Sequence, residues 1–509
     1  LAFSTGIHWN IKSLYKARNG ISGPKPHLIF GNLFDIKGMS SLKQKQYLIG
    51  KYGKIVGLYY GCRPAVQVVD PELCKHIQVK HFQYFVDRPH SLSAVFHPAM
   101  KGSIQLSRGQ RWKDIRSVQT PAFSTSKLKQ MFKSIDGSID TFLDILAKKQ
   151  QQNISDTNNN NTNDFNIYAM FELLAADIIG RTCFGYETNV QTMTADNKYH
   201  LSNARPSPKW LRYVGYCFPS MSPLVNKFCD LVDLIKHRLN LQPTGRLLDM
   251  SQDFMDFKLR SNSNQKRKDL LQLMLDTVNS QTGIDRNYSK NKQSISLSES
   301  EIRANCGFNY LAGSRTTGST LGFVAHILVN HPDVQERVRQ EVRELYETDG
   351  RLDYNTVTKL EYMECVINET MRLYPSSIDF AARETIADYK YSNNITIPKG
   401  TAIQFATYYM HRDPDYWPEP EKFDPERFSS GGSRRHEWHP YAWQPFGSGP
   451  RNCPGVRLAY FMMKLCLAKL LINYRLEPGP RTELGDIDLE TKIILMFPKN
   501  GVFVKVVKI

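Results

Sequence analysis

One cysteine lies in a short segment that is rich in residues that shape the backbone. Residues 445–455 read PFGSGPRNCPG, so Cys453 stands among three glycines and three prolines, two positions after Arg451. A thiolate is a strong soft ligand for iron, and the axial ligand of a haem has to come from a rigid loop because ligand geometry tunes the metal. A lone cysteine is more often a buried structural residue, so its neighbours have to decide between the two interpretations.

The neighbours of Cys453 favour an iron ligand. The glycines permit tight turns and a close approach of the backbone to a flat ring. Arg451 can grip a carboxylate of haem with its forked guanidinium, and Phe446 can pack as a flat wall near the sulfur. An apolar-periodic helix is expected over residues 457–471, and the dipole at its N-terminus stabilises a thiolate that precedes it.

An unusually long helix is predicted to begin after Ser298. Ser298 and Glu301 match the capping box S-x-x-E, and the helical pattern continues to Asn330 before Pro332 ends it. At 1.5 Å per residue, a helix of this extent is about 48 Å long. We therefore expect it to cross the whole molecule.

The middle of this helix reads LAGSRTTGS. Ala312 and Gly313 leave room for a flat group to approach the backbone, and Thr316 and Thr317 can bond back to carbonyl groups and bend the helix. Small residues at this place also allow a neighbouring helix to pack closely. The segment alone leaves both interpretations open.

The complete pattern F-x-x-G-x-R-x-C-x-G is present at residues 446–455 and resembles the haem-thiolate loop of the cytochrome P-450 family. The resemblance covers nearly the whole chain. It implies a mainly α fold with a small β region, in which haem b lies between the long central helix and the cysteine loop. Cys453 is then the iron ligand, and the residues expected to contact the haem are Arg451, Phe446, Trp112, Arg116, Arg383, Gly313 and, as a further candidate, Arg88.

Three further residues resemble a structural triad of the family. Glu369 and Arg372, in ETMRLYP, match its E-x-x-R pair, and Arg427, in FDPERF, matches the partner from a later loop. An isolated pair at this spacing is usually a minor surface ion pair. In the family the three side chains are buried together and hold the fold around the haem loop, and we expect the same here.

The central helix departs from the family at one position. The usual motif is A-G-x-[Asp/Glu]-T-[Thr/Ser], whereas residues 312–317 read AGSRTT, with Arg315 in place of the acid. Thr316 remains the candidate catalytic residue, but arginine cannot relay protons near neutral pH as an acid does. Either Arg315 points away from the haem and water carries protons through Thr316, or the enzyme rearranges a peroxide and needs no relay.

The resemblance implies a monooxygenase that inserts one oxygen atom from O2 into a lipophilic substrate, with NADPH electrons delivered by cytochrome P-450 reductase. The most similar branch is the drug-metabolising family 3 together with thromboxane synthase, on segments such as KLKQMF, DLLQLMLD and HRDPDYWPEPEKF. The alternative is a haem-thiolate isomerase that rearranges a peroxide without a reductase. The retained Thr316 favours the monooxygenase, and the intact loop and triad argue against a non-catalytic haem-binding protein.

Motif offsets place four apolar residues in the substrate pocket: Ile104, Phe308, Ala312 and Ile378. We therefore expect a lipophilic substrate, a description that sterols, fatty acids, eicosanoids and xenobiotics all fit. Residues 208–225, PKWLRYVGYCFPSMSPLV, mix aromatic and basic residues. They resemble the roof over the pocket that dips into the membrane, although an ordinary amphipathic surface helix has the same pattern.

The chain of 509 residues has a net charge of +17, from 66 Lys and Arg against 49 Asp and Glu. The basic residues are spread along the chain without a dense stripe, which argues against nucleic acid as a partner. An anionic membrane surface and an acidic reductase fit this charge, with cytochrome b5 as a further partner of a monomeric enzyme. Nine widely spaced cysteines without a CxxC pair argue against a disulfide framework and a zinc site.

Residues 1–26 are interpreted as the remnant of a membrane anchor with a basic, proline-containing linker, and residues 27–509 as one catalytic domain. A frayed soluble terminus is the alternative that the first residues leave open; with the anchor, we expect the enzyme on the cytosolic face of the endoplasmic reticulum membrane. Residues 50–70 predict a β-hairpin, with further strands near 395–405 and 491–507. Residues 151–164, QQNISDTNNNNTND, are polar and of low complexity, which predicts a disordered surface loop.

Overall fold

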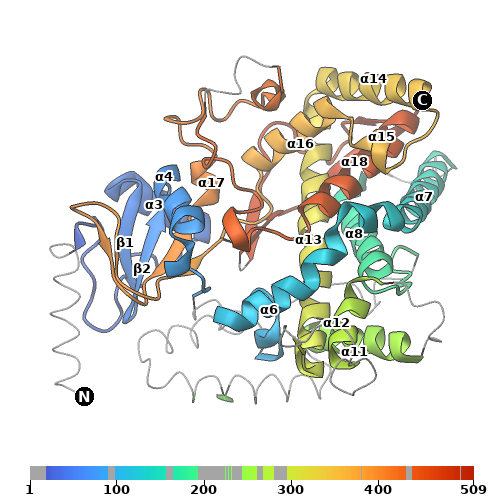
Figure 1. The fold of residues 1–509 in the computed structure, drawn as a ribbon. Helices are drawn as coiled ribbons and strands as arrows, with labels where there is room; N and C mark the ends of the chain where they lie inside the picture. The colour runs from blue at the N-terminus through green and yellow to red at the C-terminus, as the bar shows by residue number, and fades with distance from the viewer. Residues whose placement is uncertain are drawn as a thin grey trace.

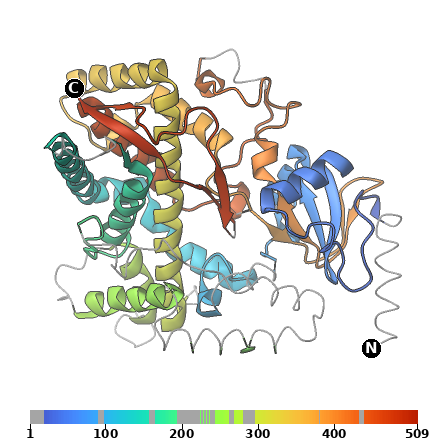
Figure 2. The same cartoon turned by 180° about the vertical axis from the view of Figure 1, so that it is seen from behind.

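A mainly helical body lies beside a smaller β region, as Figures 1 and 2 show from opposite sides. This computed structural model describes residues 19–89, 98–155, 164–192, 243–260, 268–279, 295–379, 381–431, 438–492 and 494–509, together with Leu224, Lys227, Phe228, Leu231 and Ile235. The predicted mainly α fold with a small β region is confirmed.

Helix α13 (Glu299–Asn330) runs through the middle of the helical body (Figure 2). Its capping box forms as predicted, because the Ser298 hydroxyl accepts from the Glu301 amide at 3.3 Å and Glu301 Oε2 accepts from the Ser298 amide at 2.8 Å. Most of its second half is buried, from Thr317 to Val329. A helix that is buried on all sides in this way belongs to the interior of a large domain.

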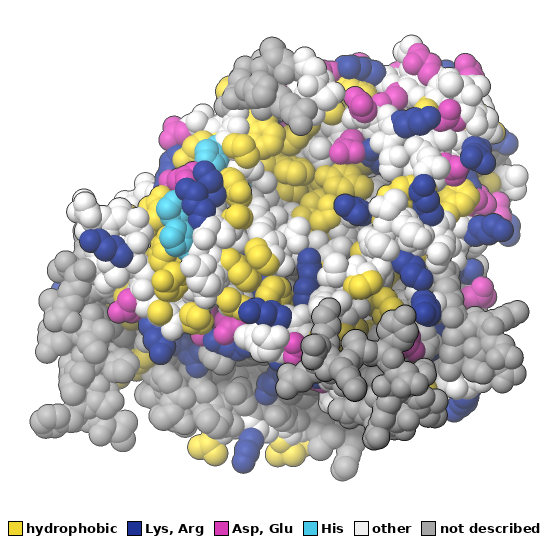
Figure 3. All heavy atoms as spheres, viewed as in Figure 1, with side chains coloured by type: hydrophobic (Ala, Val, Ile, Leu, Met, Phe, Trp, Pro, Cys, Tyr) yellow, Lys and Arg dark blue, Asp and Glu magenta, His cyan; other side chains and the backbone are white. Residues whose placement is uncertain are grey.

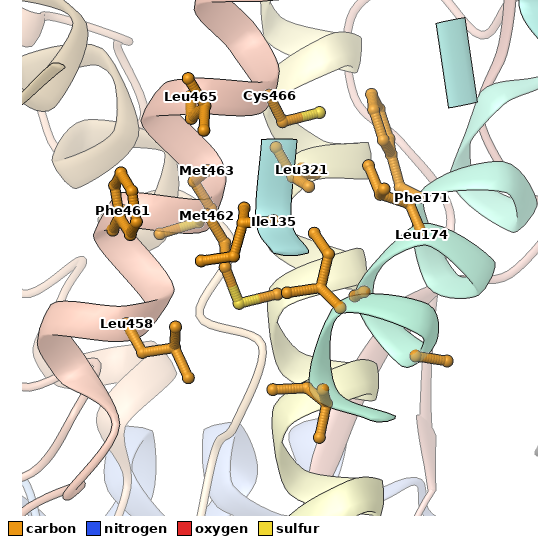
Figure 4. Packing of buried hydrophobic residues seen from close by; sticks show 14 of the residues in the cluster. Ile135, Phe171, Leu174, Leu321, Leu458, Phe461, Met462, Met463, Leu465 and Cys466 are labelled. Carbon is orange, nitrogen blue, oxygen red and sulfur yellow. The ribbon is translucent and has the colours of Figure 1, made fainter. Parts of the chain in front are cut away.

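The helices around α13 come from the whole length of the chain. They are α6 (Gly109–Gln119), α7 (Thr125–Ser155), α8 (Ile167–Cys183), α11 (Pro243–Arg260), α12 (Leu270–Asn279), α14 (Pro332–Asp349), α15 (Tyr354–Val357), α16 (Glu361–Leu373) and α18 (Val456–Asn473). Figure 4 shows apolar side chains of α18, among them Leu458 and Met462, on the side that faces α13 and α8. Burying one such side chain contributes roughly 1.5–3 kcal/mol, so this core fixes the position of α18 behind the Cys453 loop.

The main sheet has four strands in the order β1-β2-β7-β4. Strands β1 (Ile55–Tyr60) and β2 (Arg63–Val68) form the predicted antiparallel hairpin. Strand β2 pairs in parallel with β7 (Ala402–Phe405), which pairs antiparallel with β4 (Arg383–Glu384). The sheet is therefore assembled from both ends of the chain, and helices α3 (Ser41–Tyr52), α4 (Pro71–Lys75) and α17 (Thr407–Met410) lie beside it (Figure 1).

Three smaller sheets complete the β structure. Strand β11 (Phe503–Lys508) lies between β3 (Phe165–Asn166) and β8 (Tyr474–Glu477), while β9 (Leu489–Lys492) pairs with β10 (Leu495–Pro498) and β5 (Tyr389–Lys390) with β6 (Thr396–Ile397). Strands are thus present where residues 395–405 and 491–507 predict them.

Three predicted boundaries differ from the structure: both ends of the polar loop and the start of the folded domain. Helix α7 continues to Ser155, so residues 151–155 are helical, and Gln151 and Gln152 at their start are good helix formers. Asp164, at the other end of the predicted loop, is buried and accepts from the Arg481 amide at 2.7 Å. At the N-terminus, Ile21 is 2 % exposed and Ser22 bridges Val56 of β1, so the folded domain begins before residue 27.

Several predictions concern residues outside the described ranges. These are residues 1–18 of the anchor remnant, residues 156–163 of the polar loop and all of the roof segment 208–225 except Leu224, which is 66 % exposed. Among the helices that are described, none is long and apolar enough to cross a membrane.

Candidate functional site

A cavity lies between the middle of α13 and the loop that carries Cys453. Phe308, Ala312, Gly313 and Thr316 line it from α13, and residues 445–446 and 451–455 line it from the loop. This is the arrangement that the sequence predicts for a flat cofactor held between the two elements.

The Cys453 loop is held in shape by its own backbone and by its neighbour. The Cys453 amide donates to the Phe446 carbonyl at 2.9 Å. Gly449 has a φ of 70°, in the left-handed region that favours glycine. A Cβ atom at Gly449 would lie 1.9 Å from the carbonyl oxygen of Gln78 in η1 (His76–Lys80). The loop therefore has the rigidity that an axial ligand needs.

Cys453 is partly buried at the wall of the cavity. Burial raises the pKa of the Cys453 thiol, whereas the Gly455 amide and the Arg116 guanidinium lower it. Burial disfavours an isolated thiolate, and a cation on the cavity side would favour the deprotonated sulfur. An iron ion bound there would supply that charge, which fits the predicted ligand.

Three arginines from separate segments lie close enough to repel one another. Arg88, Arg383 and Arg451 are all at least 97 % buried, with exposed fractions of 3 %, 0 % and 3 %. Burial, with repulsion from Arg451, lowers the pKa of Arg383 to about 9, and burial with repulsion from both others lowers the pKa of Arg88. A buried charge without a compensating partner is costly.

This arginine cluster is suited to bind a negatively charged group. Within the described ranges, Nε and Nη2 of Arg383 and Nε of Arg451 have no hydrogen-bond partner. Arg88 and Arg451 line the cavity, whereas Arg383 does not reach its lining. The two carboxylates of haem supply the missing negative charge, so the residues present fit this cofactor. Which arginine contacts which carboxylate stays a prediction.

Trp112 and Arg116 lie one turn apart on α6, and both line the cavity. The Arg451 guanidinium lies 4.4 Å from the centre of the Trp112 ring, a cation–π contact. Arg116 donates to the carbonyl of Asn452 at 2.9 Å and to its side-chain oxygen at 3.0 Å. Arg116 therefore ties α6 to the loop beside Cys453, and its predicted contact with a haem carboxylate remains untested.

Glu369, Arg372 and Arg427 are buried together, as the family motif leads us to expect. Arg372 donates to both carboxylate oxygens of Glu369 at 2.7 Å, and Arg427 Nε lies 3.4 Å from Glu369 Oε1. The Arg372 side chain also donates to the carbonyl groups of His411, Pro420 and Lys422. Glu369 and Arg372 are thus paired, and the remaining N–H groups of Arg372 are satisfied by carbonyl groups, as a buried ion pair requires.

A chain of hydrogen bonds connects this triad to the Cys453 loop. His411, whose carbonyl accepts from Arg372, accepts the Gln444 amide proton at its Nε2 over 2.8 Å. Gln444 Oε1 accepts from Gln78 Nε2 at 2.6 Å, and Gln78 Oε1 accepts from the Ser448 amide at 2.8 Å. Sequence reasoning missed His411, Gln78 and Gln444, because nothing in their own types or spacing indicates that they meet.

Arg315, the departure from the family motif, lies outside the cavity lining. Its Nη1 is 2.5 Å from Oε1 of Glu172 on α8, and the two side chains are 15 % and 13 % exposed. Glu172 also accepts from the Tyr168 hydroxyl at 2.9 Å. Arg315 therefore points toward α8, as the first of the two alternatives requires.

The glycines of α13 allow α8 to pack closely against it. A Cβ at Gly313 would lie 2.6 Å from Ile179 Cδ1, one at Gly318 would lie 2.8 Å from Glu172 Cα, and one at Gly322 would lie 2.7 Å from the Tyr168 ring. Gly313 also lines the cavity. Both interpretations of the small residues thus apply: this stretch borders the cavity and admits a close helix.

The predicted substrate residues are only partly in the cavity wall. Ile104, Phe308 and Ala312 line it, whereas Ile378 does not. Ile378 is 1 % exposed, and its amide donates to the Ile494 carbonyl at 2.9 Å. The residues of this segment that line the cavity are Ser376 and Ser377. A motif offset locates the segment but not the direction of its side chains.

A family model described as Cytochrome P450 matches residues 21–506. Cytochrome P450 3A14 of Cavia porcellus is 33 % identical over 515 residues, which cover 99 % of this chain and 93 % of that protein. Cytochrome P450 3A9 of Rattus norvegicus and lithocholate 6-beta-hydroxylase of Mesocricetus auratus are both 32 % identical with the same coverage. The likeness therefore extends over the whole fold and not only over the cysteine loop.

Proposed function

The chain belongs to the cytochrome P450 family, in its family 3 branch, and is a haem-thiolate monooxygenase; on that premise, we propose that it oxidises a lipophilic substrate with electrons that NADPH supplies through cytochrome P450 reductase. One oxygen atom of O2 enters the substrate. The observation that carries the proposal is the position of Cys453 across one cavity from residues 312–316 of α13.

A thiolate-ligated haem supplies the reductive activation of O2 when it is bound. Cys453 would hold the iron, and Arg88 and Arg451 would bind the carboxylates from the cavity wall. Phe446 would cover the sulfur side of the ring. Cys453, Arg451 and Phe446 come from one loop that backbone hydrogen bonds hold in shape, so the protein contributes a preorganised binding site.

Thr316 would handle protons on the substrate side of the cavity. Its hydroxyl donates to the Ala312 carbonyl at 2.7 Å and lines the cavity. Both lone pairs of the hydroxyl remain available to a water molecule that carries a proton inward. Arg315 takes no part in this step, because its guanidinium is engaged by Glu172 on α8.

Apolar residues around Thr316 keep bulk water out of the cavity. Ile104, Phe308, Leu311 and Ile494 all line it. Such a lining favours a lipophilic substrate and strengthens every polar contact inside.

The surface charge supports an acidic electron donor and an anionic membrane as partners. Lys and Arg side chains lie scattered among hydrophobic and acidic ones on the face seen in Figure 3, and the net charge is +17. Charge complementarity of this kind speeds encounter with an acidic protein. We place the enzyme at the endoplasmic reticulum membrane, with cytochrome b5 as a further electron donor.

The test is a carbon monoxide difference spectrum of the purified holoenzyme, reduced by NADPH and reductase in one sample and by dithionite in another. A strongly red-shifted Soret band in both samples is expected. The Cys453→Ser variant should bind haem but lose that band, because an alcohol does not give a thiolate signature. An unchanged band in the variant would overturn the ligand assignment. A wild-type band that appears only with dithionite, even with a lipophilic ligand added, would indicate peroxide rearrangement instead.

A further inference from the structure

Five side-chain hydroxyls line the cavity beside its apolar residues. Thr316, Thr317 and Thr320 belong to α13, and Ser376 and Ser377 follow α16. The two groups meet where Thr320 Oγ1 lies 3.5 Å from Ser376 Oγ. We call these five residues the hydroxyl strip.

The protons of the hydroxyl strip are largely engaged by backbone carbonyl groups. Thr320 Oγ1 donates to the Thr316 carbonyl at 2.9 Å, and Thr316 Oγ1 donates to the Ala312 carbonyl at 2.7 Å. Ser377 Oγ donates to the Ile494 carbonyl at 3.2 Å. A hydroxyl that has given its proton away still has two lone pairs. The strip therefore offers acceptors to whatever lies in the cavity.

A second polar group in the wall offers the opposite function. Gln105 lines the same cavity and is 4 % exposed, and its amide nitrogen has no hydrogen-bond partner in the part of the chain that the structure describes. A buried donor left unpaired costs about 1–3 kcal/mol. Away from the arginines, the cavity thus combines hydroxyl acceptors and one donor without a partner with apolar residues such as Ile104 and Phe308.

We infer that the substrate is a lipophilic alcohol, whose hydroxyl donates to the hydroxyl strip and orients the molecule in the cavity. An alcohol can donate to the strip and accept from Gln105, a ketone can only accept, and a hydrocarbon can do neither. The inference rests on the proposed function, since it names the substrate class of the same cavity.

Three probes of one shape separate these cases: cyclododecanol, cyclododecanone and cyclododecane. Their dissociation constants are measured with the holoenzyme by equilibrium dialysis, which needs no turnover. We expect the alcohol to bind about tenfold more tightly than the ketone, as one additional hydrogen bond in an apolar site provides. The hydrocarbon should bind more weakly than the alcohol by at least the same factor.

The hydroxyl strip is tested by the triple variant Thr320→Val, Ser376→Ala and Ser377→Ala. In this variant the affinity for the alcohol should exceed the affinity for the ketone by no more than about twofold. Thr348→Val is the matched control, because the Thr348 hydroxyl makes the same bond to the backbone carbonyl four residues earlier, at 2.7 Å, on exposed α14. The control should keep the wild-type ratio. Melting temperature and the carbon monoxide band show that each variant is folded.

Equal affinity of the wild type for alcohol and ketone would overturn the inference, and a selectivity that survives in the triple variant would overturn the role of the hydroxyl strip. Either result leaves the proposed function intact if the carbon monoxide band is present. A missing band would refute the proposed function, while the dialysis result would still report on the cavity.

Discussion

Two acid–arginine contacts in this molecule have the same chemistry in different surroundings. Glu369 and Arg372 are 2.7 Å apart with both side chains fully buried. Arg372 also begins the chain of hydrogen bonds that leads through His411 to the Cys453 loop. Glu172 and Arg315 are 2.5 Å apart with 13 % and 15 % of their side chains exposed, and they join α8 to α13.

The surroundings decide what each contact is for. Removing one member of a fully buried pair leaves the other charge without a partner and costs about 3–5 kcal/mol. A partly exposed pair retains water as an alternative partner and contributes about 0–1 kcal/mol. The first contact is therefore needed for the structure around the Cys453 loop, whereas the second can be removed at a small cost.

The strongest test of the comparison is Glu369→Gln. The change keeps the shape of the side chain but leaves Arg372 and Arg427 buried without their anion, so we expect a loss of about 3–5 kcal/mol in the free energy of unfolding. Urea denaturation measures this loss, and the thiolate band should fall with the folded fraction. A loss below about 1 kcal/mol would place the triad in the same class as an exposed pair.

The variant Gly449→Ala tests the Cys453 loop, which lies at the other end of the hydrogen-bond chain from the triad. The new Cβ would meet the Gln78 carbonyl oxygen at 1.9 Å, in a backbone of φ 70° that disfavours alanine. We expect a loss of roughly 2–3 kcal/mol, from strain and the displaced contact. Gly350→Ala is the control, because Gly350 has a φ of 67° and nothing within 4 Å of its Cβ position. If both variants lose the same stability, the contact with Gln78 is unimportant.

His411, which contacts the triad, should make the free energy of unfolding depend on pH. Burial lowers the pKa of His411 to about 3, whereas an unfolded histidine has a pKa of about 6.5. The unfolded state therefore takes up the proton first, and stability should fall by about 1.4 kcal/mol per pH unit as the pH drops below 6.5.

The variant His411→Gln should lack this contribution, since glutamine does not titrate and can still accept the Gln444 amide proton. Urea denaturation of both proteins at pH 7 and pH 5.5 measures the difference, and the other histidines cancel because both proteins contain them. Parallel loss of stability in the two proteins would show that His411 is not the group that titrates.

The smallest effect is expected at the partly exposed contact of Arg315 with Glu172. Arg315→Met should change the free energy of unfolding by no more than about 1 kcal/mol. Arg315→Glu brings two acids together and should cost more, and the double variant with Glu172→Arg should restore the wild-type value. Arg337→Met, which breaks the more exposed Arg337–Glu426 pair at 2.6 Å, is the matched control. A loss of several kcal/mol for Arg315→Met would erase the distinction between the two contacts.

The same variants report on chemistry. If water already carries protons past Thr316, Arg315→Met should leave the ratio of product formed to NADPH consumed unchanged. A rise in this coupling ratio for the double variant alone would show that an acid at position 315 improves proton delivery.

Local signals in the sequence predicted elements and motifs well. The Ser298 cap fixed the start of α13, the apolar pattern of residues 50–70 gave β1 and β2, and the spacing around Cys453 indicated a constrained loop. These features depend on residues that are neighbours in the chain, so their types and spacing carry the information.

Contacts between distant segments were not predictable in the same way. Ser376 and Ser377 line the cavity, whereas Ile378 does not. The backbone of this segment is fixed by two hydrogen bonds to the region of β10: the Ile378 amide donates to the Ile494 carbonyl, and the Met496 amide donates to the Ser376 carbonyl. The direction of these side chains depends on a partner more than a hundred residues away. The hydrogen bonds of His411 with Gln444, and the contact of Arg315 with Glu172, depend on tertiary packing for the same reason.

Helix α13 has two faces whose freedom to vary differs. Gly313, Gly318 and Gly322 lie so close to α8 that any side chain there would collide with it, while Thr317 and Thr320 border the cavity, where Thr320 Oγ1 lies 3.5 Å from Ser376 Oγ. Selection can therefore exchange residues on the cavity face without disturbing the helix pair. A lineage of such enzymes can acquire new substrates along one side of a single helix while the other side preserves the fold.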